Sequence, residues 1–300
     1  MTHSYQAFGL HIHSEIEFPN LPPATAPDLP EVYIQVASLP AALPGAPETS
    51  RYFQAVQGKL LVRINDIGRM LVENGQRITF EPLPGAEAVN VRLALSNLGL
   101  SAILHQRGAL ALHASAIATP GGAVLFCGAR QAGKSTLAAG LHQHGWPLVC
   151  DDKAALRLDE GQLLVIPSFP ELRLWRDAIQ QLDFAGMRAE KTPAMDKFNL
   201  GLSQGFHDSP LPLRAIYLLR PAPINEIHIT PLNGMSKFQV IKRHTYTNQF
   251  LRDLGLLPAH FNLASAVASQ AEMALVTRPG QVNRLEELIR LMDARLREEA

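Results

Sequence analysis

The sequence predicts an α/β protein with a β-rich N-terminal region, and the order of its apolar segments supports this fold class. Up to residue 85, β-prone runs follow one another, separated by turn signals such as Asn74-Gly75. Beyond residue 85, strand-like apolar runs are interleaved with helix-like amphipathic segments, as in a sheet covered by helices. We therefore predict two domains, residues 1–85 and residues 86–300.

The composition excludes several classes of partner. The 27 Lys and Arg residues balance 27 Asp and Glu residues, so no basic field would attract nucleic acid or an anionic membrane. No apolar run reaches the roughly 18 residues of a membrane span, and the N-terminus lacks a basic stretch followed by an apolar one. We expect a cytoplasmic protein that binds neither nucleic acid nor a membrane. Cys127 and Cys150 each end an apolar run and are expected to be buried thiols in neighbouring strands.

The N-terminal region carries no recognisable catalytic motif. Its β-prone runs are 8–16, 32–37, 52–64 and 69–80, and the proline-rich stretches 19–30 and 40–47 are expected to be loops. Its histidines His3, His11 and His13 have no carboxylate or cysteine at ligand spacing. We predict that they are polar surface residues.

The C-terminal region contains the interleaved elements. We predict strands at 109–118, 123–127, 146–150, 213–219, 226–230 and 273–277, a hairpin at 154–166, and helices at 89–107, 135–145, 171–182, 236–254, 258–270 and 282–299. Residues 183–212 resemble a mobile loop in which Lys191 and Lys197 are either phosphate ligands or solvated charges.

A phosphate-binding loop is the strongest motif. Gly128-Ala129-Arg130-Gln131-Ala132-Gly133-Lys134-Ser135 has the form G-x-x-x-x-G-K-[ST] and lies between a strand-like run and a helix-like run that includes Thr136. The glycines let the backbone aim its N–H groups at phosphate oxygens, and the following helix adds the positive end of its dipole. Lys134 would reach the β- and γ-phosphates, and the Ser135 hydroxyl would hold Mg²⁺. The alternative is an ordinary strand-to-helix turn.

A pair of aspartates follows the next apolar strand. Asp151 and Asp152 come directly after Cys150, at the strand end where open α/β sheets bind ligands. Adjacent carboxylates repel each other unless Mg²⁺ or Lys134 compensates their charge. The alternative is a solvated turn or helix cap. His113 lies in the strand before the loop, where a histidine taken alone is more often a core residue than a catalyst.

Taken together, His113, the loop 128–135 and Asp151-Asp152 resemble, in order and spacing, the core of the HPr serine kinase/phosphorylase family. The fold of that family is akin to that of phosphoenolpyruvate carboxykinase. The resemblance covers roughly residues 105–200. It implies that Asp151 is the base that deprotonates a serine hydroxyl, with His113 beside it and Asp152 on the metal side.

The resemblance also implies a metal-associated glutamate and a direction of reaction. Glu171, in Pro170-Glu171-Leu172-Arg173, resembles the Mg²⁺-associated glutamate of the family's E-x-R-G motif. Leu174 replaces the glycine of that motif, so we expect a kinase without phosphorylase activity. The β-rich leader and His-Ala-Ser-Ala after Arg107-Gly108 look more like the HPr-kinase-related proteins of peptide natural-product clusters. These include the kinases that phosphorylate a serine of a lasso-peptide precursor.

The sequence therefore predicts a magnesium- and ATP-dependent kinase acting on a serine of a peptide or small protein. Two alternatives remain open: a nucleotide-binding regulator that performs no transfer, and a small-molecule or carboxykinase-like phosphotransferase. The histidine and aspartates argue against the regulator, because a protein that only binds nucleotide needs no base beside the γ-phosphate. The identity of the acceptor and the formation of homo-oligomers also stay open.

Overall fold

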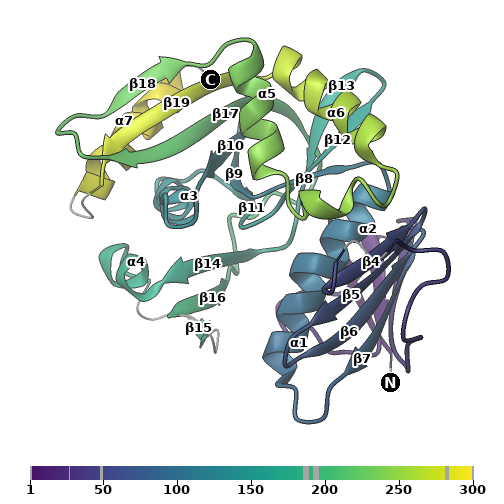
Figure 1. The fold of residues 1–300 in the computed structure, drawn as a ribbon. Coiled ribbons are helices and arrows are strands. Elements are labelled where there is room, and N and C mark those ends of the chain that lie inside the picture. Colours follow the sequence, from purple (N-terminus) through teal and green to yellow (C-terminus); the bar gives the residue numbers. More distant parts are fainter. Residues whose placement is uncertain are drawn as a thin grey trace. The chain divides into compact units, whose positions relative to one another are not determined.

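The computed structural model describes residues 2–26, 28–47, 50–184, 189–191, 196–280 and 284–298 (Figure 1). The chain forms two compact units, and each contains two stretches of sequence. Unit 1 comprises residues 1–111 and 246–263, and unit 2 comprises residues 112–245 and 264–300. Both are mixed α/β structures. Within the described ranges, no helix combines the length and apolar character needed to cross a membrane.

Unit 1 is built on a seven-stranded sheet with the order β1-β2-β3-β7-β6-β5-β4. Its strands are β1 (His3–Ala7), β2 (Leu10–Ser14), β3 (Glu31–Val36), β4 (Phe53–Val56), β5 (Lys59–Ile64), β6 (Gly68–Glu73) and β7 (Arg77–Pro82). The pairs β2–β3 and β3–β7 are parallel, whereas the other neighbours are antiparallel. In β2 the residues Leu10, Ile12 and Ser14 are buried and alternate with His11 and His13, so one face of the strand packs inward.

A broken helix belongs to this unit rather than to the C-terminal region, to which the sequence prediction assigned it. It consists of α1 (Ala88–Ala94), a π-helical turn η1 (Leu95–Gly99) and α2 (Leu100–Gln106). At the turn, a Cβ on Gly99 would lie 2.9 Å from Ile78 Cδ1 and 3.0 Å from Met70 Sδ, so the helix packs tightly on β6 and β7. The predicted boundary at residue 85 therefore falls within unit 1.

The segment 246–263 returns to unit 1 from a distant part of the sequence. The ring of Phe250 meets that of Phe53 edge-on at 4.8 Å, and the Nε2 of His105 is 2.8 Å from the Tyr246 carbonyl oxygen. The helix predicted at 236–254 is interrupted here. It ends at His244, because Thr245 is extended and Thr247 adopts a left-handed conformation.

The main sheet of unit 2 has the order β11-β9-β10-β17-β13-β12, and β19 and β18 continue it from β17. The strands are β9 (Ala114–Thr119), β10 (Gly122–Gly128), β11 (Leu148–Cys150), β12 (Ala154–Asp159), β13 (Gln162–Ile166), β17 (Leu211–Ala222), β18 (His228–Pro231) and β19 (Glu272–Pro279). A short strand, β8 (Leu110–Leu112), lies where the chain passes between the units. β10, β17 and β19 are mutually parallel, so their carboxyl ends meet at one edge.

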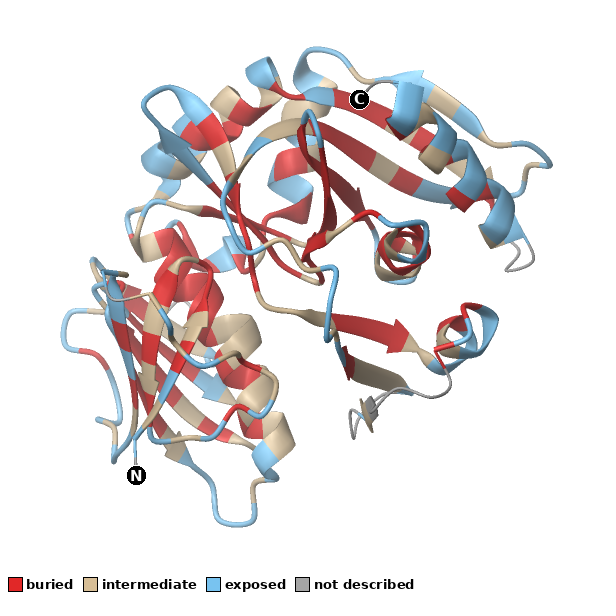
Figure 2. Ribbon diagram, turned by 180° about the vertical axis from the view of Figure 1, so that it is seen from behind, coloured by how far each residue is buried: buried red, intermediate tan, exposed pale blue. Residues whose placement is uncertain are grey.

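Helices complete unit 2. They are α3 (Lys134–Gln143), α4 (Arg176–Gln181), α5 (Met235–His244), the later part of α6 (Leu257–Gln270) and α7 (Leu285–Glu298), while the short 3₁₀ turn η2 (Asn248–Phe250) lies in unit 1. α3 and α7 share a buried apolar core with the strands, visible as red segments in Figure 2. A Cβ on Gly140 of α3 would collide with Ile289 of α7, so the two helices approach closely.

A second sheet in unit 2 corrects two predictions. It has the order β14-β16-β15, formed by β14 (Glu171–Trp175), β15 (Ala189–Lys191) and β16 (Lys197–Gly201). The helix predicted at 171–182 is therefore β14 followed by α4, because the buried Leu172 and Leu174 alternate with period two. The loop predicted at 183–212 contains β15 and β16, and parts of it, 185–188 and 192–195, lie outside the described residues.

The two cysteines are buried and unbridged, as predicted, but their strands are not adjacent. Cys127 of β10 pairs with Ala114 and Cys150 of β11 pairs with Ala116, so β9 separates them. Burial raises the pKa of Cys127 to about 12, which keeps it a neutral thiol.

A glycine at the start of β6 provides a test of the sheet in unit 1. A Cβ on Gly68 would collide with the carbonyl oxygen of Glu81 and lie 2.9 Å from Phe80 Cζ, whereas one on Gly85 would meet no atom within 4 Å. We expect Gly68→Ala to lower the free energy of unfolding by about 3 kcal/mol. Gly85→Ala should cost only about 1 kcal/mol of left-handed strain. Urea unfolding of both variants measures the difference, and equal losses would contradict the close packing at Gly68.

Candidate functional site

The predicted phosphate-binding loop joins β10 to α3 in unit 2, and its two glycines are needed for its path. A Cβ on Gly128 would lie 2.8 Å from both the Leu219 carbonyl oxygen and Ala132 Cβ, so only glycine lets the loop pass this close to β17. Gly133 has φ +97° and forms the N-cap of α3. α3 therefore begins directly at the loop, and a helix N-terminus offers free backbone N–H groups to an anion.

Lys134 lies in the mouth of this loop. It is only 6% exposed, and its Nζ donates hydrogen bonds to the carbonyl oxygens of Gly128 (3.1 Å) and Ala129 (3.2 Å). Burial lowers its pKa, and the carboxylate of Asp152 partly opposes that shift. The ammonium group is bonded only weakly to neutral carbonyls here, so an anionic phosphate would be a stronger partner.

Arg278 supports the loop from a distant part of the sequence. Its Nη2 and Nε donate to the Ala132 carbonyl oxygen at 2.9 Å and 3.2 Å, from near the carboxyl end of β19. The sequence analysis gave Arg278 no role. Its position at the end of a strand was the available signal, because the carboxyl ends of β10, β17 and β19 meet at the same edge.

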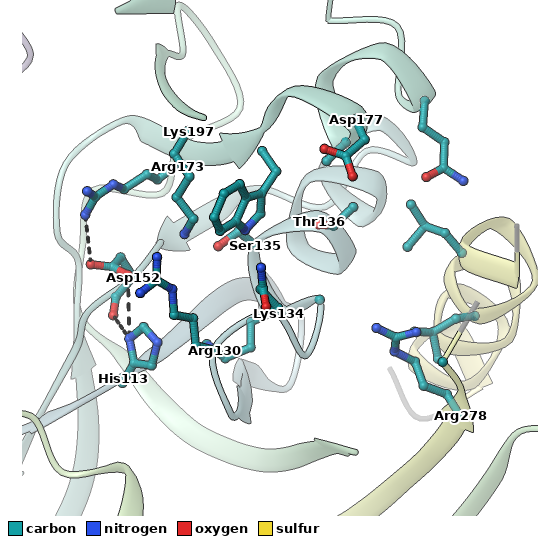
Figure 3. Close-up of a pocket in the computed structure, with 18 residues that line it drawn as sticks. His113, Arg130, Lys134, Ser135, Thr136, Asp152, Arg173, Asp177, Lys197 and Arg278 are labelled. Atoms are coloured by element: carbon teal, nitrogen blue, oxygen red, sulfur yellow. Dashed lines mark hydrogen bonds and ion pairs between the residues drawn. The ribbon is translucent and has the colours of Figure 1, made fainter. Parts of the chain in front are cut away.

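A cavity opens between the loop, Asp152 and the second sheet (Figure 3). Among the described residues, those lining it include five cationic side chains and two carboxylates; these are Arg130, Lys134, Arg173, Lys197 and Arg278, and Asp152 and Asp177. The excess of positive charge favours a polyanionic ligand. Trp175 forms part of the wall, with the Lys197 ammonium 5.4 Å and the Arg130 guanidinium 5.9 Å from its ring centroid.

The two aspartates have different environments. Asp151 is 9% exposed and does not line the cavity. Its Oδ1 accepts a hydrogen bond from Ser115 Oγ at 2.5 Å, and its Oδ2 accepts one from the Arg173 backbone N–H at 2.8 Å. This carboxylate therefore ties β9 and β14 to the end of β11. Both of its oxygens are engaged within the protein.

Asp152 is the aspartate that faces the cavity. Its side chain is 18% exposed, with Oδ2 3.6 Å from Arg173 Nη1 and Oδ1 3.5 Å from His113 Nδ1. Burial raises the pKa of Asp152, but the neighbouring charges of His113 and Arg173 outweigh it and lower the pKa below its ordinary value. The residue has φ +63°, a conformation rare outside glycine that concentrates at functional sites.

His113 has a defined tautomer. Its Nδ1 lies 3.0 Å from the carbonyl oxygen of Asp152, and because a carbonyl only accepts, Nδ1 donates and Nε2 keeps its lone pair. Burial lowers the pKa of His113, which keeps the ring neutral at neutral pH. Its backbone N–H donates to the His244 carbonyl oxygen at 2.8 Å. His244, at the end of α5, is buried, and burial lowers its pKa to about 4.

The structure brings most, but not all, of the predicted residues together. Arg130, Gln131, Gly133, Lys134, Ser135 and Thr136 line the cavity with His113 and Asp152, while Gly128, Ala129 and Ala132 form the loop behind them. Glu171 does not line it, although it shares a face of β14 with Arg173 and Trp175, which do. Lys197 lines the cavity, whereas Lys191 is exposed and lies 3.9 Å from Asp196.

The oxygen donors of the cavity suit Mg²⁺. This ion is usually held by one or two carboxylates and by substrate phosphates, and it keeps several waters. The hydroxyl of Ser135 and the carboxylate of Asp177 provide such oxygens. The buried Nε of Arg173 has no hydrogen-bond partner in the part of the chain that the structure describes, so it can donate to a bound anion. Both observations fit a nucleoside triphosphate with its metal ion.

Comparisons with known proteins add little to this geometry. The sequence matches no protein-family model and no curated protein. Among solved structures, the chain is similar to one described as "Structure of the Hpr(Ser) kinase/phosphatase from Coxiella burnetii", at 13% identity over 63% of this chain and 99% of that chain, with a TM-score of 0.33. So low a score supports no conclusion about the site.

Substitution of Asp151 tests its structural role. Asp151→Ala leaves the Ser115 hydroxyl and the Arg173 N–H unpaired in a buried position, so we expect the free energy of unfolding to fall by about 2–3 kcal/mol. In Asp151→Asn the amide oxygen accepts from Arg173 and the amide nitrogen donates to Ser115, so stability should be nearly unchanged. Thermal unfolding compares the two. An Ala variant as stable as the parent would refute the structural role.

Proposed function

We propose that the protein transfers the γ-phosphoryl group of ATP to a hydroxyl acceptor. The observation that carries this proposal is that the phosphate-loop residues Lys134 and Ser135 line the same cavity as Asp152. Phosphoryl transfer requires positioning and charge neutralisation more than covalent help, and this cavity offers both.

The donor side is built from the loop and the cations around it. Lys134, Arg278 and the N-terminus of α3 would bind the phosphate chain, while the Ser135 hydroxyl would hold Mg²⁺. When bound, Mg²⁺ neutralises charge on the β- and γ-phosphates. Arg130 and Lys197, which flank Trp175, would neutralise charge that develops on the transferred group.

The acceptor side centres on Asp152 instead of Asp151. The acceptor hydroxyl oxygen would attack the γ-phosphorus as the bond to the β–γ bridging oxygen breaks and ADP leaves. The proton of the hydroxyl would pass to the Asp152 carboxylate, which Arg173 and His113 hold in place. Asp151 acts as a positioning residue, because its hydrogen bond to the Arg173 N–H fixes the backbone of β14 where Arg173 lines the cavity.

A serine of a peptide or small protein, such as a lasso-peptide precursor, is the acceptor that we propose. The support comes from the sequence, where His113, the loop and the aspartate pair resemble HPr-kinase-related proteins. A regulator that binds ATP without transferring phosphate is the second candidate, since the cations alone explain binding. The strained conformation of Asp152, held at φ +63° among cations, favours transfer.

The direct experiment combines binding with mass spectrometry. Trp175 lines the cavity, and Trp146, the other tryptophan, is buried and donates to Asp293 Oδ1 at 2.7 Å, so MgATP binding should change Trp175 fluorescence. Trp175→Phe is the control for that signal. Serine-containing peptides incubated with MgATP should gain a phosphate. Binding without any phosphorylated peptide or small-molecule product would favour the regulator.

Lys134→Ala should abolish nucleotide-dependent activity and leave the fold intact. The ammonium group neutralises phosphate charge, whereas its own hydrogen bonds are only to two loop carbonyls. ATP affinity is measured from the Trp175 fluorescence, and circular dichroism checks the fold. A variant that binds and turns over ATP like the parent would show that the loop is not the nucleotide site.

Asp152→Asn separates the chemical step from binding. Asparagine keeps the size of the side chain but cannot accept the proton, so single-turnover phosphorylation should fall by roughly 10²–10⁴-fold while MgATP affinity is retained. Asp151→Asn is the matched control and should retain transfer. An equal loss of affinity and rate in Asp152→Asn would make Asp152 a metal ligand. Loss of transfer in Asp151→Asn at normal stability would instead restore Asp151 as the base.

A further inference from the structure

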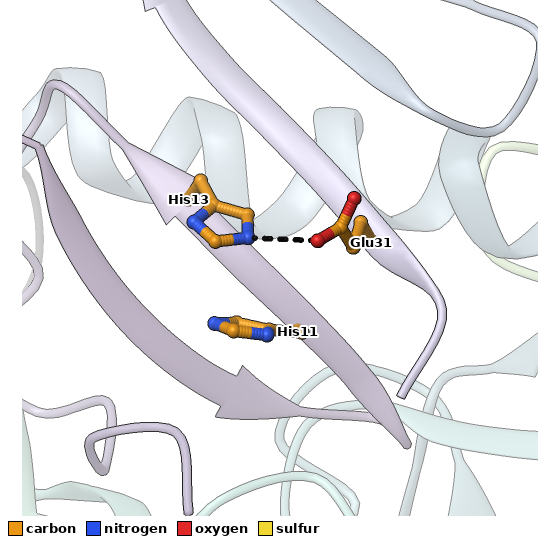
Figure 4. A group of neighbouring side chains, drawn as sticks. All are labelled: His11, His13 and Glu31. Carbon is orange, nitrogen blue, oxygen red and sulfur yellow. Dashed lines mark ion pairs between the residues drawn. The ribbon is translucent and has the colours of Figure 1, made fainter. Parts of the chain in front are cut away.

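Three potential metal ligands meet on the sheet of unit 1, far along the chain from the phosphate loop. His11 and His13 occupy alternate positions of β2 and therefore point to the same face. β3 pairs with β2 in parallel, which sets Glu31 opposite His11 and Tyr33 opposite His13. Figure 4 shows the His13 ring directed at the Glu31 carboxylate, with the His11 ring beside it. The sequence analysis missed this carboxylate because strand pairing alone brings it to the histidines.

The distances suit one small cation. One ligand atom from each residue can be chosen so that all three lie within 4.8 Å of one another. His13 Nε2 is 3.5 Å from Glu31 Oε1, and the two imidazole centroids are 4.1 Å apart. Ligands of a tetrahedral Zn²⁺ at 2.0–2.1 Å are separated by about 3.3 Å. The two rings face each other at an interplanar angle of 30°, so binding requires one ring to rotate until both nitrogens point at the ion.

The surrounding bonds orient each ligand and leave an atom for the metal. His13 Nε2 is buried and has no hydrogen-bond partner among the described residues, although it faces Glu31. Glu31 is engaged through Oε2, which accepts from the Tyr33 hydroxyl at 2.5 Å, so Oε1 is the oxygen directed at His13. His11 Nε2 is 2.7 Å from Ser4 Oγ, and with Nε2 as the donor its Nδ1 keeps the lone pair.

We propose that His11, His13 and Glu31 form a binding site for a divalent transition-metal ion of the Zn²⁺ class, with water as the fourth ligand. Two imidazole nitrogens and a carboxylate suit Zn²⁺, Co²⁺ or Ni²⁺, whereas Mg²⁺ and Ca²⁺ select oxygen ligands. The Tyr33 ring stacks on that of His13 with the centroids 5.0 Å apart, and its hydroxyl donates a hydrogen bond to Glu31. Ser4 is hydrogen-bonded to His11. These outer contacts are of the kind that fix ligand orientation. The site lies wholly within unit 1 and is independent of the proposed kinase activity.

Cobalt provides a direct readout. Co²⁺ added to the purified full chain should give the visible absorption of a tetrahedral or five-coordinate centre at one equivalent, and Zn²⁺ should displace it. His11→Ala and His13→Ala should each weaken Zn²⁺ binding by more than about 100-fold, the upper end of what an outer-shell partner costs. Ser4→Ala should weaken it by only about 10-fold.

His3→Ala is the matched control. His3 lies in neighbouring β1 and stacks on Tyr5 at 5.9 Å, outside the ligand set, so its removal should leave Zn²⁺ affinity unchanged. Glu31→Gln tests the carboxylate and should change the Co²⁺ spectrum as well as the affinity. Absence of Co²⁺ bands at several-fold excess, or Zn²⁺ binding that persists in His13→Ala, would overturn the proposal. Neither outcome depends on ATP or phosphorylation, so a failed kinase assay leaves the result interpretable.

Discussion

The carboxylate of Asp151 is the contact on which the candidate site depends. It accepts hydrogen bonds from Ser115 in β9 and from the backbone of Arg173 in β14, so it joins the main sheet of unit 2 to the smaller one. The smaller sheet supplies Arg173, Trp175 and Lys197 to the cavity wall. A buried carboxylate with both oxygens paired stabilises this junction, whereas an unpaired one would oppose folding.

The two sheets together place more cationic than anionic side chains around the cavity. Burial lowers the pKa of Lys134 and of Lys197, and in both cases the nearby Asp152 carboxylate partly restores it. Each cation is thus held in an environment that disfavours its charge. A polyanion entering the cavity would relieve this cost at several residues together, which is how preorganised sites obtain affinity and transition-state stabilisation.

Local features of this protein could be predicted from the sequence, and non-local ones could not. The phosphate loop is continuous in sequence, so its glycines, Lys134 and Ser135 identified it without knowledge of the sheet. Arg278 and Glu31 depend on strand pairing, in which β19 lies against β17 and β3 against β2. The helix expected at 171–182 failed because short apolar segments fit both periods, and burial of Leu172 and Leu174 selects the strand.

The aspartate pair shows why two identical neighbours take different roles. In an extended strand, successive side chains point to opposite faces, so Asp151 and Asp152 could not both reach one ligand. β11 ends at Cys150, and the left-handed conformation at Asp152 directs its carboxylate toward His113 and Arg173. Asp151 remains in the interior with Ser115. A sequence pattern identifies the pair, but the backbone conformation of Asp152 decides which carboxylate faces the cavity.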